Sequence, residues 1–168
     1  MRKLMFVLAA ATALTAVPAI AGDTAKVPVT ISAPAAGQGQ VVFFRPGKFV
    51  GSAIRCTVRE DGKMLGRAGN GHYFVVSAAP GAHRYTTKTE ATDTLNVEVE
   101  PDETTYVKCS IGMGVMAGRP NLSPATPEDF GQVAHKIKPT DMADIAKDIA
   151  KDDAERASKA PAAAAASN

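Results

Sequence analysis

Residues 70–83 read NGHYFVVSAAPGAH, an aromatic and β-branched run that lies between two glycine turns. Asn-Gly and Pro-Gly are turn dipeptides, and the residues between them favour extended backbone. We therefore expect a strand at 72–77 that turns back into a second strand at 82–90. In such a hairpin His72 and His83 are about four or five residues apart, or roughly 13–16 Å. That distance is too long for one metal ion, so the stretch predicts a hairpin and not a histidine site.

The same succession of short strands and turns continues on both sides of this hairpin. Further strands are expected at 41–45, 49–60, 63–68, 93–100 and 104–111, with an Asp61-Gly62 hairpin after the second of these. Helical periodicity is almost absent between residues 40 and 111. About seven short strands separated by turn residues are typical of an antiparallel β-sandwich. We assign this all-β domain to residues 40–120.

Two helices are expected after the sandwich. In the extension at 121–138, Thr126-Pro127 followed by acidic residues has the pattern of a short helix start. A second helix at 139–160 has a narrow apolar stripe of Met142, Ile145 and Ile149 on an otherwise charged surface. This helix either packs back on the sandwich or contacts another protein. The alanine-rich tail at 161–168 is expected to be disordered.

The start of the chain has the composition of a secretory signal peptide. Residues 1–21 contain two basic residues, a short apolar run and small residues before the Ala21-Gly22 bond. Cleavage near this bond predicts a periplasmic or secreted protein. The run is short for a membrane anchor, and glycine stands where a lipoprotein needs cysteine, so the mature form is expected to be neither membrane-spanning nor lipid-anchored. The linker at 22–39 has an alternation around Val29 that fits an edge strand.

The charge balance excludes one class of partner. Without Arg2 and Lys3 the chain has 17 basic and 17 acidic residues and is formally neutral. A neutral chain has no global attraction for nucleic acid or for anionic membranes. No nucleic-acid partner is therefore expected.

The two cysteines, Cys56 and Cys109, both lie in alternating stretches. Parity places Cys56 on one face with Ile54 and Val58, and Cys109 has similar apolar neighbours on its own strand. Facing strands of one core would bring the thiols together, which leaves a disulfide and two buried free thiols as the alternatives. Burial on an apolar face disfavours a reactive thiolate, so neither cysteine is expected to be catalytic.

A charge asymmetry along the strands suggests a basic face. Residues 41–88 hold eight basic residues and only two acids, whereas residues 89–103 hold six acids and no base. The basic side chains that strand parity points outward are Arg55, Arg59, Arg84 and Lys88. Together they predict an anion-binding face for polysaccharide or envelope phosphate. Alternatively, Glu98 and Glu100 on the next strand neutralise the last two by cross-strand pairing.

Several motifs between residues 41 and 120 resemble a known bacterial family. FFRPGKFVGSAIRCTV, DGKMLGRAGNGHYFVV, PGAHRY and SIGMGVMAGRP are similar to the domain-of-unknown-function family 2846, and DGK…PGAH is also similar to the hairpins of PEGA-type surface modules. The motif residues are Arg45, Pro46, Gly62, Tyr73, Pro80, Gly81, Gly112, Met113 and Gly114. The resemblance implies an exported envelope protein and brings no established reaction. Many members look like lipoproteins, and this chain departs from them by lacking the acceptor cysteine.

These observations favour a protein that works by contact. We expect no catalytic, metal-binding or cofactor-binding residues, and therefore no enzyme activity and no cofactor. The expected function is that of a non-enzymatic exported envelope protein, a binding or accessory module whose partner is another envelope protein or an envelope glycan. The alternative is a hydrolase or an anionic-glycan-binding protein that acts on envelope polymers.

Overall fold

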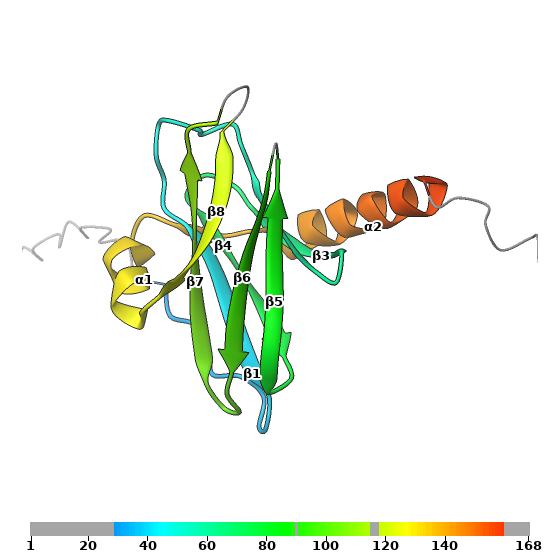
Figure 1. Cartoon of the computed structure of the whole chain (residues 1–168). Helices are drawn as coiled ribbons and strands as arrows, with labels where there is room; N and C mark the ends of the chain where they lie inside the picture. Colours follow the sequence, from blue (N-terminus) through cyan, green and yellow to red (C-terminus); the bar gives the residue numbers. More distant parts are fainter. Residues whose placement is uncertain (1–28, 90, 115–117, 160–168) are drawn as a thin grey trace, which may run out of the picture.

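The computed structural model of the protein describes residues 29–89, 91–114 and 118–159, which form nine strands in two sheets and two helices (Figure 1). The five-stranded sheet contains, in spatial order, β8 (Arg119–Ala125), β7 (Thr104–Gly112), β1 (Gly39–Arg45), β4 (His72–Ala78) and β9 (Lys138–Pro139). The four-stranded sheet contains β3 (Lys63–Ala68), β2 (Cys56–Glu60), β5 (Gly81–Lys88) and β6 (Thr92–Val99). The chain is thus mostly β, as its sequence predicts.

Some of the expected segments lie outside the described residues. These are the signal peptide at 1–21, the first part of the linker at 22–28 and the tail at 161–168. In the rest of the linker, residues 29–35 have no regular secondary structure where an edge strand was expected. Val29 and Ile31 instead pack against the outer side of the five-stranded sheet.

The strand β1 lies at the centre of the five-stranded sheet because its residues suit burial on both faces. Every residue of GQVVFFR is buried, and such a run is typical of a strand covered on both sides.

The five-stranded sheet is mixed. β1 pairs antiparallel with β4 and parallel with β7, and β4 also pairs parallel with β9. The prediction of a purely antiparallel arrangement is wrong for the pairs β1–β7 and β4–β9. The chain reaches β7 only after passing through the other sheet, so no hairpin fixes its direction.

Tight turns join the strands of the four-stranded sheet. Asp61 and Gly62 both have positive φ, 48° and 79°, as a two-residue hairpin turn between β2 and β3 requires. This confirms the Asp61-Gly62 hairpin. β5 pairs along its full length with β6, from Gly81 opposite Val99 to Lys88 opposite Thr92.

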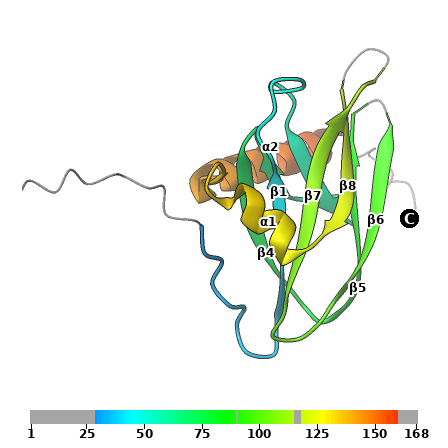
Figure 2. The ribbon, with the colours of Figure 1, turned by 90° about the vertical axis from the view of Figure 1, so that its left-hand side faces the viewer.

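The two sheets face each other across a shared core (Figure 2). Phe43 of β1 stacks on Phe74 of β4 at 5.2 Å between ring centroids and meets the edge of Tyr85 of β5 at 5.0 Å. Cys56 of β2 and Cys109 of β7 form a disulfide with their Cα atoms 6.5 Å apart. Of the two alternatives for the cysteines, the structure therefore has the disulfide, and it joins one sheet to the other.

A second apolar cluster covers the outer face of the five-stranded sheet. The helix α1 (Pro127–Ala134) begins after Thr126, as the sequence predicts, and Thr126 and Asp129 form a capping box there. Its Phe130 meets the edges of Phe44 and Tyr73, with ring centroids at 5.4 and 5.7 Å. One face of β1 thus packs on the other sheet and its opposite face packs on α1.

The largest differences from the predicted strands concern β2 and β8. β2 begins at Cys56, because residues 49–53 turn and cross from one sheet to the other instead of extending the strand. β8 forms at Arg119–Ala125, where alternation is lost and no strand was predicted. It is an edge strand, in which Pro120 and Pro124 are tolerated because only one side of the strand needs N–H donors.

The second helix, α2 (Met142–Lys159), contacts β3 and extends beyond the sheets (Figure 1). It begins three residues later than the predicted range of 139–160 and continues to Lys159, the last residue that the structure describes. Its Ile145 is buried, with Leu65 and Ile149 beside the same cluster. Of the two alternatives for this helix, the structure has it packed against the domain.

Candidate binding surface

The most distinctive surface of the described chain lies where β1 and β7 end. Because these strands are parallel neighbours, the residues that follow them emerge at the same end of the five-stranded sheet. We call this the loop end, and define it as residues 46–55 together with residues 112–114 and 118. The two segments touch: a methyl group on Gly51 would lie 2.8 Å from Ile111, and one on Gly118 would lie 2.4 Å from Ile54. Gly51 also has φ +74°, which favours glycine.

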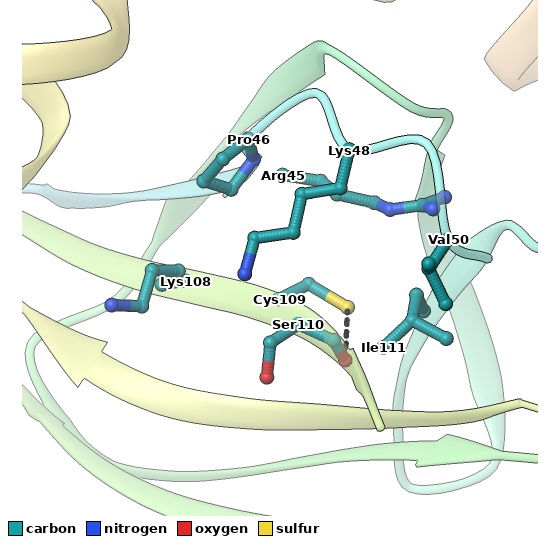
Figure 3. A pocket seen from close by; sticks show the side chains of 8 residues that line it. All are labelled: Arg45, Pro46, Lys48, Val50, Lys108, Cys109, Ser110 and Ile111. Carbon is teal, nitrogen blue, oxygen red and sulfur yellow. Dashed lines mark hydrogen bonds between the residues drawn. The ribbon is translucent and has the colours of Figure 1, made fainter. Parts of the chain in front are cut away.

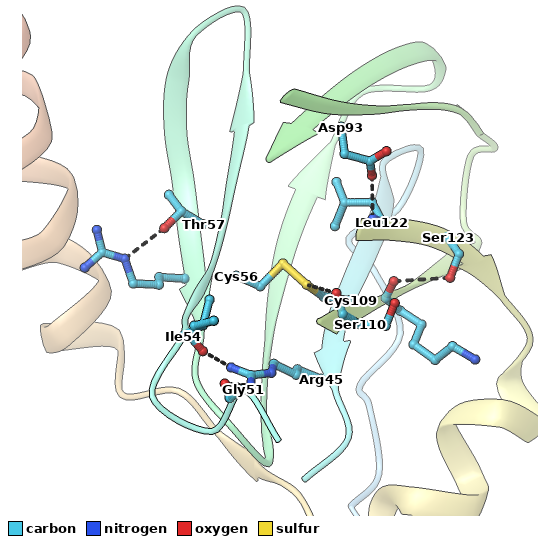
Figure 4. The surroundings of a disulfide bond; sticks show 12 residues. Arg45, Gly51, Ile54, Cys56, Thr57, Asp93, Cys109, Ser110, Leu122 and Ser123 are labelled. Atoms are coloured by element: carbon cyan, nitrogen blue, oxygen red, sulfur yellow. Dashed lines mark hydrogen bonds between the residues drawn. A yellow bond between two sulfur atoms is a disulfide. The ribbon is translucent and has the colours of Figure 1, made fainter. Parts of the chain in front are cut away.

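Arg45 holds the first of these segments in place (Figure 4). Its side chain is fully buried, and its guanidinium donates hydrogen bonds to the carbonyl oxygens of Gly51, at 2.7 Å, and of Ile54. Burial lowers the pKa of Arg45. It makes no ion pair with a carboxylate in the part of the chain that the structure describes. A buried guanidinium that binds two loop carbonyls fixes the path of the loop across the end of the core.

A small basic hollow lies beside this loop (Figure 3). It has a volume of about 170 Å³ and runs between the end of β1 and the last residues of β7. Arg45, Lys48 and Lys108 contribute three cationic side chains to its lining, and Val50 and Ile111 contribute apolar ones. Neither lysine has a carboxylate within 4 Å among the described residues. The hollow therefore offers an anion positive charge beside an apolar rim.

Apolar side chains point into solvent at the same end. Phe49 is 96% exposed, Met113 is 86% exposed and Val50 is 65% exposed. The fourth large exposed apolar side chain of the described residues is Met142, at the start of α2. Single exposed apolar residues are ordinary, but several together beside a basic hollow indicate a binding surface.

The predicted anion-binding face is not a single open surface, because α2 covers half of it. Arg59 forms a bidentate ion pair with Asp152, and Arg55 lies 3.8 Å from Asp148. Arg67, which the sequence argument did not include, also binds Asp148 at 3.2 Å. The hydrogen bonds that Arg59 donates to Asp152 raise the pKa of Arg59 and lower the pKa of Asp152. The sequence feature that could have indicated these ion pairs is the i, i+4 spacing of Asp148 and Asp152, which places both carboxylates on one face of the helix.

Arg84 and Lys88 form the other half of that predicted face. Both are exposed on β5, where their cross-strand partners are Asn96 and Thr92. The alternative was that Glu98 and Glu100 neutralise these two cations across the strands. Neither glutamate lies directly opposite either cation, and no such ion pair forms among the described residues. The structure does not bring these two cations together with Arg55 and Arg59 into one uncovered site.

The motif residues of the family divide into structural residues and residues of the loop end. Gly62 and Gly81 have φ of 79° and 130°, so they serve turns, and Tyr73 packs against α1. Pro80 belongs to the turn before β5. The motif residues at the loop end or leading into it are Arg45, Pro46, Gly112, Met113 and Gly114. The motifs that the sequence could not assign thus gather at the surface described here.

The histidines remain apart. His72 Nδ1 donates to the carbonyl oxygen of Asn70 at 2.9 Å, next to the loop end. His83 lies on β5, beyond the Pro80-Gly81 turn, where Nδ1 binds the Glu60 carboxylate at 2.6 Å and Nε2 binds the carbonyl oxygen of Ala79 at 2.8 Å. The prediction that residues 72–90 form a hairpin is wrong, because β4 pairs with β1 in the five-stranded sheet, whereas β5 pairs with β2 and β6 in the four-stranded sheet. In the described ranges no group of three or more histidine, cysteine, aspartate and glutamate side chains is placed to hold a metal ion.

Comparisons with known proteins give one match. Searches of curated proteins and of solved structures found nothing similar to the chain. Neither helix of the described residues is long and apolar enough to cross a membrane. A family described as protein of unknown function (DUF2846) matches residues 35–120, which is just over half of the 168 residues and contains β1 to β7 with the basic hollow. The chain therefore belongs to the DUF2846 family.

Proposed function

We propose that this protein is a non-enzymatic exported envelope protein, and that it acts as a binding or accessory module through its loop end. In this proposal the two sheets form a sandwich that serves as a scaffold. The observation that supports it most is the pairing of a buried anchor with exposed apolar side chains. Arg45 fixes a loop that exposes Phe49 and Val50 beside a basic hollow. A loop fixed in this way presents its apolar residues to a partner at little cost in conformational entropy.

Export is supported by two independent features. The first 21 residues have the pattern of a cleaved signal peptide. The disulfide between Cys56 and Cys109 is of the kind that persists in oxidising compartments such as the bacterial periplasm. We therefore place the mature protein in the periplasm or outside the cell, starting near Gly22 and without a lipid anchor. Intact-mass measurement of the periplasmic fraction tests this, because an uncleaved Met1 would contradict it.

The alternative function, a hydrolase or an anionic-glycan-binding protein, has less support. Glycan binding was inferred from Arg55, Arg59, Arg84 and Lys88, and the first two of these are already paired with aspartates of α2. A glycan would have to displace α2 or bind the remaining cations of β5 alone.

A photo-crosslinking experiment in cells tests the proposed binding surface. We would replace Phe49 with p-benzoylphenylalanine in the full chain and compare it with the same replacement at Met142, which is also exposed but lies outside the loop end. Position 49 is expected to give a specific crosslinked envelope component, protein or lipid, and position 142 is not. Equal or absent crosslinking at the two positions would contradict the proposal. Turnover of a purified envelope glycan by the protein would contradict the proposal that it is not an enzyme.

A further inference from the structure

We infer that the partner of the loop end is the surface of a bilayer that contains anionic phospholipid. In this arrangement the hollow takes a lipid phosphate, and the exposed apolar side chains enter the interfacial layer. The inference rests on the proposed function, which makes the loop end a binding surface, and adds the chemistry of what is bound.

The charges at this end fit an anionic surface. Residues 46–55 contain Lys48 and Arg55, and residues 104–118 contain Lys108, whereas neither segment contains an aspartate or a glutamate. Two acids of the helices act on these cations. Asp129 of α1 has its pKa lowered chiefly by hydrogen bonds from Thr126, with a smaller effect of Lys108, and Asp148 of α2 lies 3.8 Å from Arg55. All the charged residues that line the hollow are cationic.

The position of the basic residues decides membrane binding, because the mature chain has no net charge. Without the predicted signal peptide the basic and acidic residues are equal in number, so long-range attraction to a membrane is weak. Attraction begins when the loop end comes within about 10 Å, the Debye length at ordinary salt. The protein is therefore expected to bind a membrane in one orientation, with the loop end first.

The apolar side chains of the loop end add hydrophobic contact with the bilayer to the attraction between charges. Phe49, Val50 and Met113 extend from two neighbouring segments of chain and are more than half exposed. Membrane proteins that bind reversibly combine apolar side chains in the interfacial layer with lysines and arginines that contact anionic headgroups. An amphiphile that carries a phosphate beside hydrocarbon has the same arrangement of anion and apolar surface that the hollow and its rim can bind.

Cosedimentation with vesicles tests the inference. The full mature chain would be mixed with phosphatidylcholine vesicles that contain phosphatidylglycerol, and with vesicles of phosphatidylcholine alone. Binding is expected to the first and much less to the second, and added salt should weaken it. Lys48→Ser and Lys108→Ser should each reduce affinity about fivefold. The double variant Phe49→Ser, Val50→Ser should reduce it roughly tenfold or more.

Matched controls come from the same chain. Lys63→Ser removes an exposed cation at the start of β3, beside the Asp61-Gly62 turn and outside the loop end. Met142→Ser removes an exposed apolar side chain that also lies outside the loop end. Neither should change vesicle binding. Urea unfolding of each variant shows whether it is folded, and since Lys48 and Phe49 are exposed, their variants stay informative if Lys108→Ser is unstable. Added inorganic phosphate shows whether the ligand is a lipid phosphate or free phosphate. If the ligand is a lipid phosphate, inorganic phosphate should leave the protein bound to the vesicles.

The outcomes separate the inference from the proposed function. Equal binding to both kinds of vesicle, full displacement by phosphate, or binding that the loop-end variants leave unchanged would overturn the lipid inference. If the crosslinker at position 49 captures a protein and vesicles are not bound, the inference fails while the proposed function stands. If neither crosslinks nor vesicle binding appear, both fail.

Discussion

Arg45 shows how one side chain can decide where a binding loop lies. At the end of β1 the backbone leaves the sheet, and the guanidinium turns into the space between the sheets to bind the carbonyl oxygens of Gly51 and Ile54. The interaction spans six and nine residues of sequence and needs no acid. From the sequence this residue was a motif position without a role, because nothing in the letters shows that an arginine faces inward.

Replacing Arg45 with methionine is expected to lower the free energy of unfolding by about 1–3 kcal/mol, since two partly buried carbonyl oxygens lose their donor. Urea unfolding followed by circular dichroism measures this. Arg84→Met is the control, because Arg84 is exposed and makes no ion pair or hydrogen bond with the described residues, and it should change stability very little. Equal stability of the two variants would mean that the loop is held by other contacts. Arg45→Met should also weaken whatever binds at the loop end.

His83 provides a prediction about pH. Burial of the ring acts to lower its pKa, but hydrogen bonds to Ala79 and Glu60 and the charge of Glu98 outweigh it, so the pKa of His83 is raised. A histidine with a raised folded pKa stabilises the protein fully below its unfolded value, about 6.5, and loses that effect as pH rises through the folded pKa. His83→Gln should therefore cost most stability below about pH 6. The difference from the unchanged protein should shrink above the raised pKa, which urea unfolding across pH would show.

At the scale of elements, α2 behaves as an acidic cover on the outer side of β2 and β3. Asp148 and Asp152 lie one turn apart and meet arginines that the two strands place side by side. The apolar contact between α2 and the sheets is small, since Ile145 is the one buried side chain among the described residues of the helix. The helix is therefore held by charge to an unusual degree, and its attachment depends on salt.

The double variant Asp148→Asn, Asp152→Asn should loosen α2 without unfolding the sheets. Partly exposed ion pairs contribute up to about 1 kcal/mol each, so amide exchange in α2 should accelerate several-fold while exchange in β1 and β7 stays slow. The pKa of Asp152 is lowered, so the stabilisation it gives is present above its unfolded value and is lost as pH falls through the folded one. Asp144→Asn with Asp153→Asn is the control, because the ion pairs of those acids lie within the helix, and only a weaker charge effect of Asp153 reaches Arg59. Equal exchange in the two double variants would contradict the role of the arginines.

The sequence predicted elements where local rules decide them and missed those that depend on the rest of the fold. Turn dipeptides and alternation located β3 to β7, and the cap at Thr126 located α1. β8 has prolines that argue against a strand, and only its place at a sheet edge permits one. The candidate site was predicted least well. Parity indicated which arginines point outward, but the acids that cover them lie more than 80 residues away in the chain.

For the molecule as a whole, the disulfide is the strongest single link between the sheets. Cys56 and Cys109 are 53 residues apart, and in the chain-entropy model a bond that closes such a loop contributes about 4 kcal/mol. The variant Cys56→Ala, Cys109→Ala should lose stability of this order, and reductant should change the unfolding midpoint of the natural chain but not that of the variant. Identical midpoints for the natural chain with and without reductant would contradict a structural role.

The central position of β1 also has a consequence for how the nascent chain folds. β1 is the first of the described strands to be synthesised, yet one of its two neighbours is β7, whose Thr104 lies 64 residues beyond Gln40. Until that segment arrives, the VVFF run has one edge without hydrogen-bond partners, and an uncharged strand edge of this kind is a template for aggregation. Closing so long a loop is also slow. A chain whose synthesis stops before Gly112 would therefore aggregate with its own copies. Correct folding requires that the exposed edge of β1 stays separate from other copies of the chain until β7 has been synthesised.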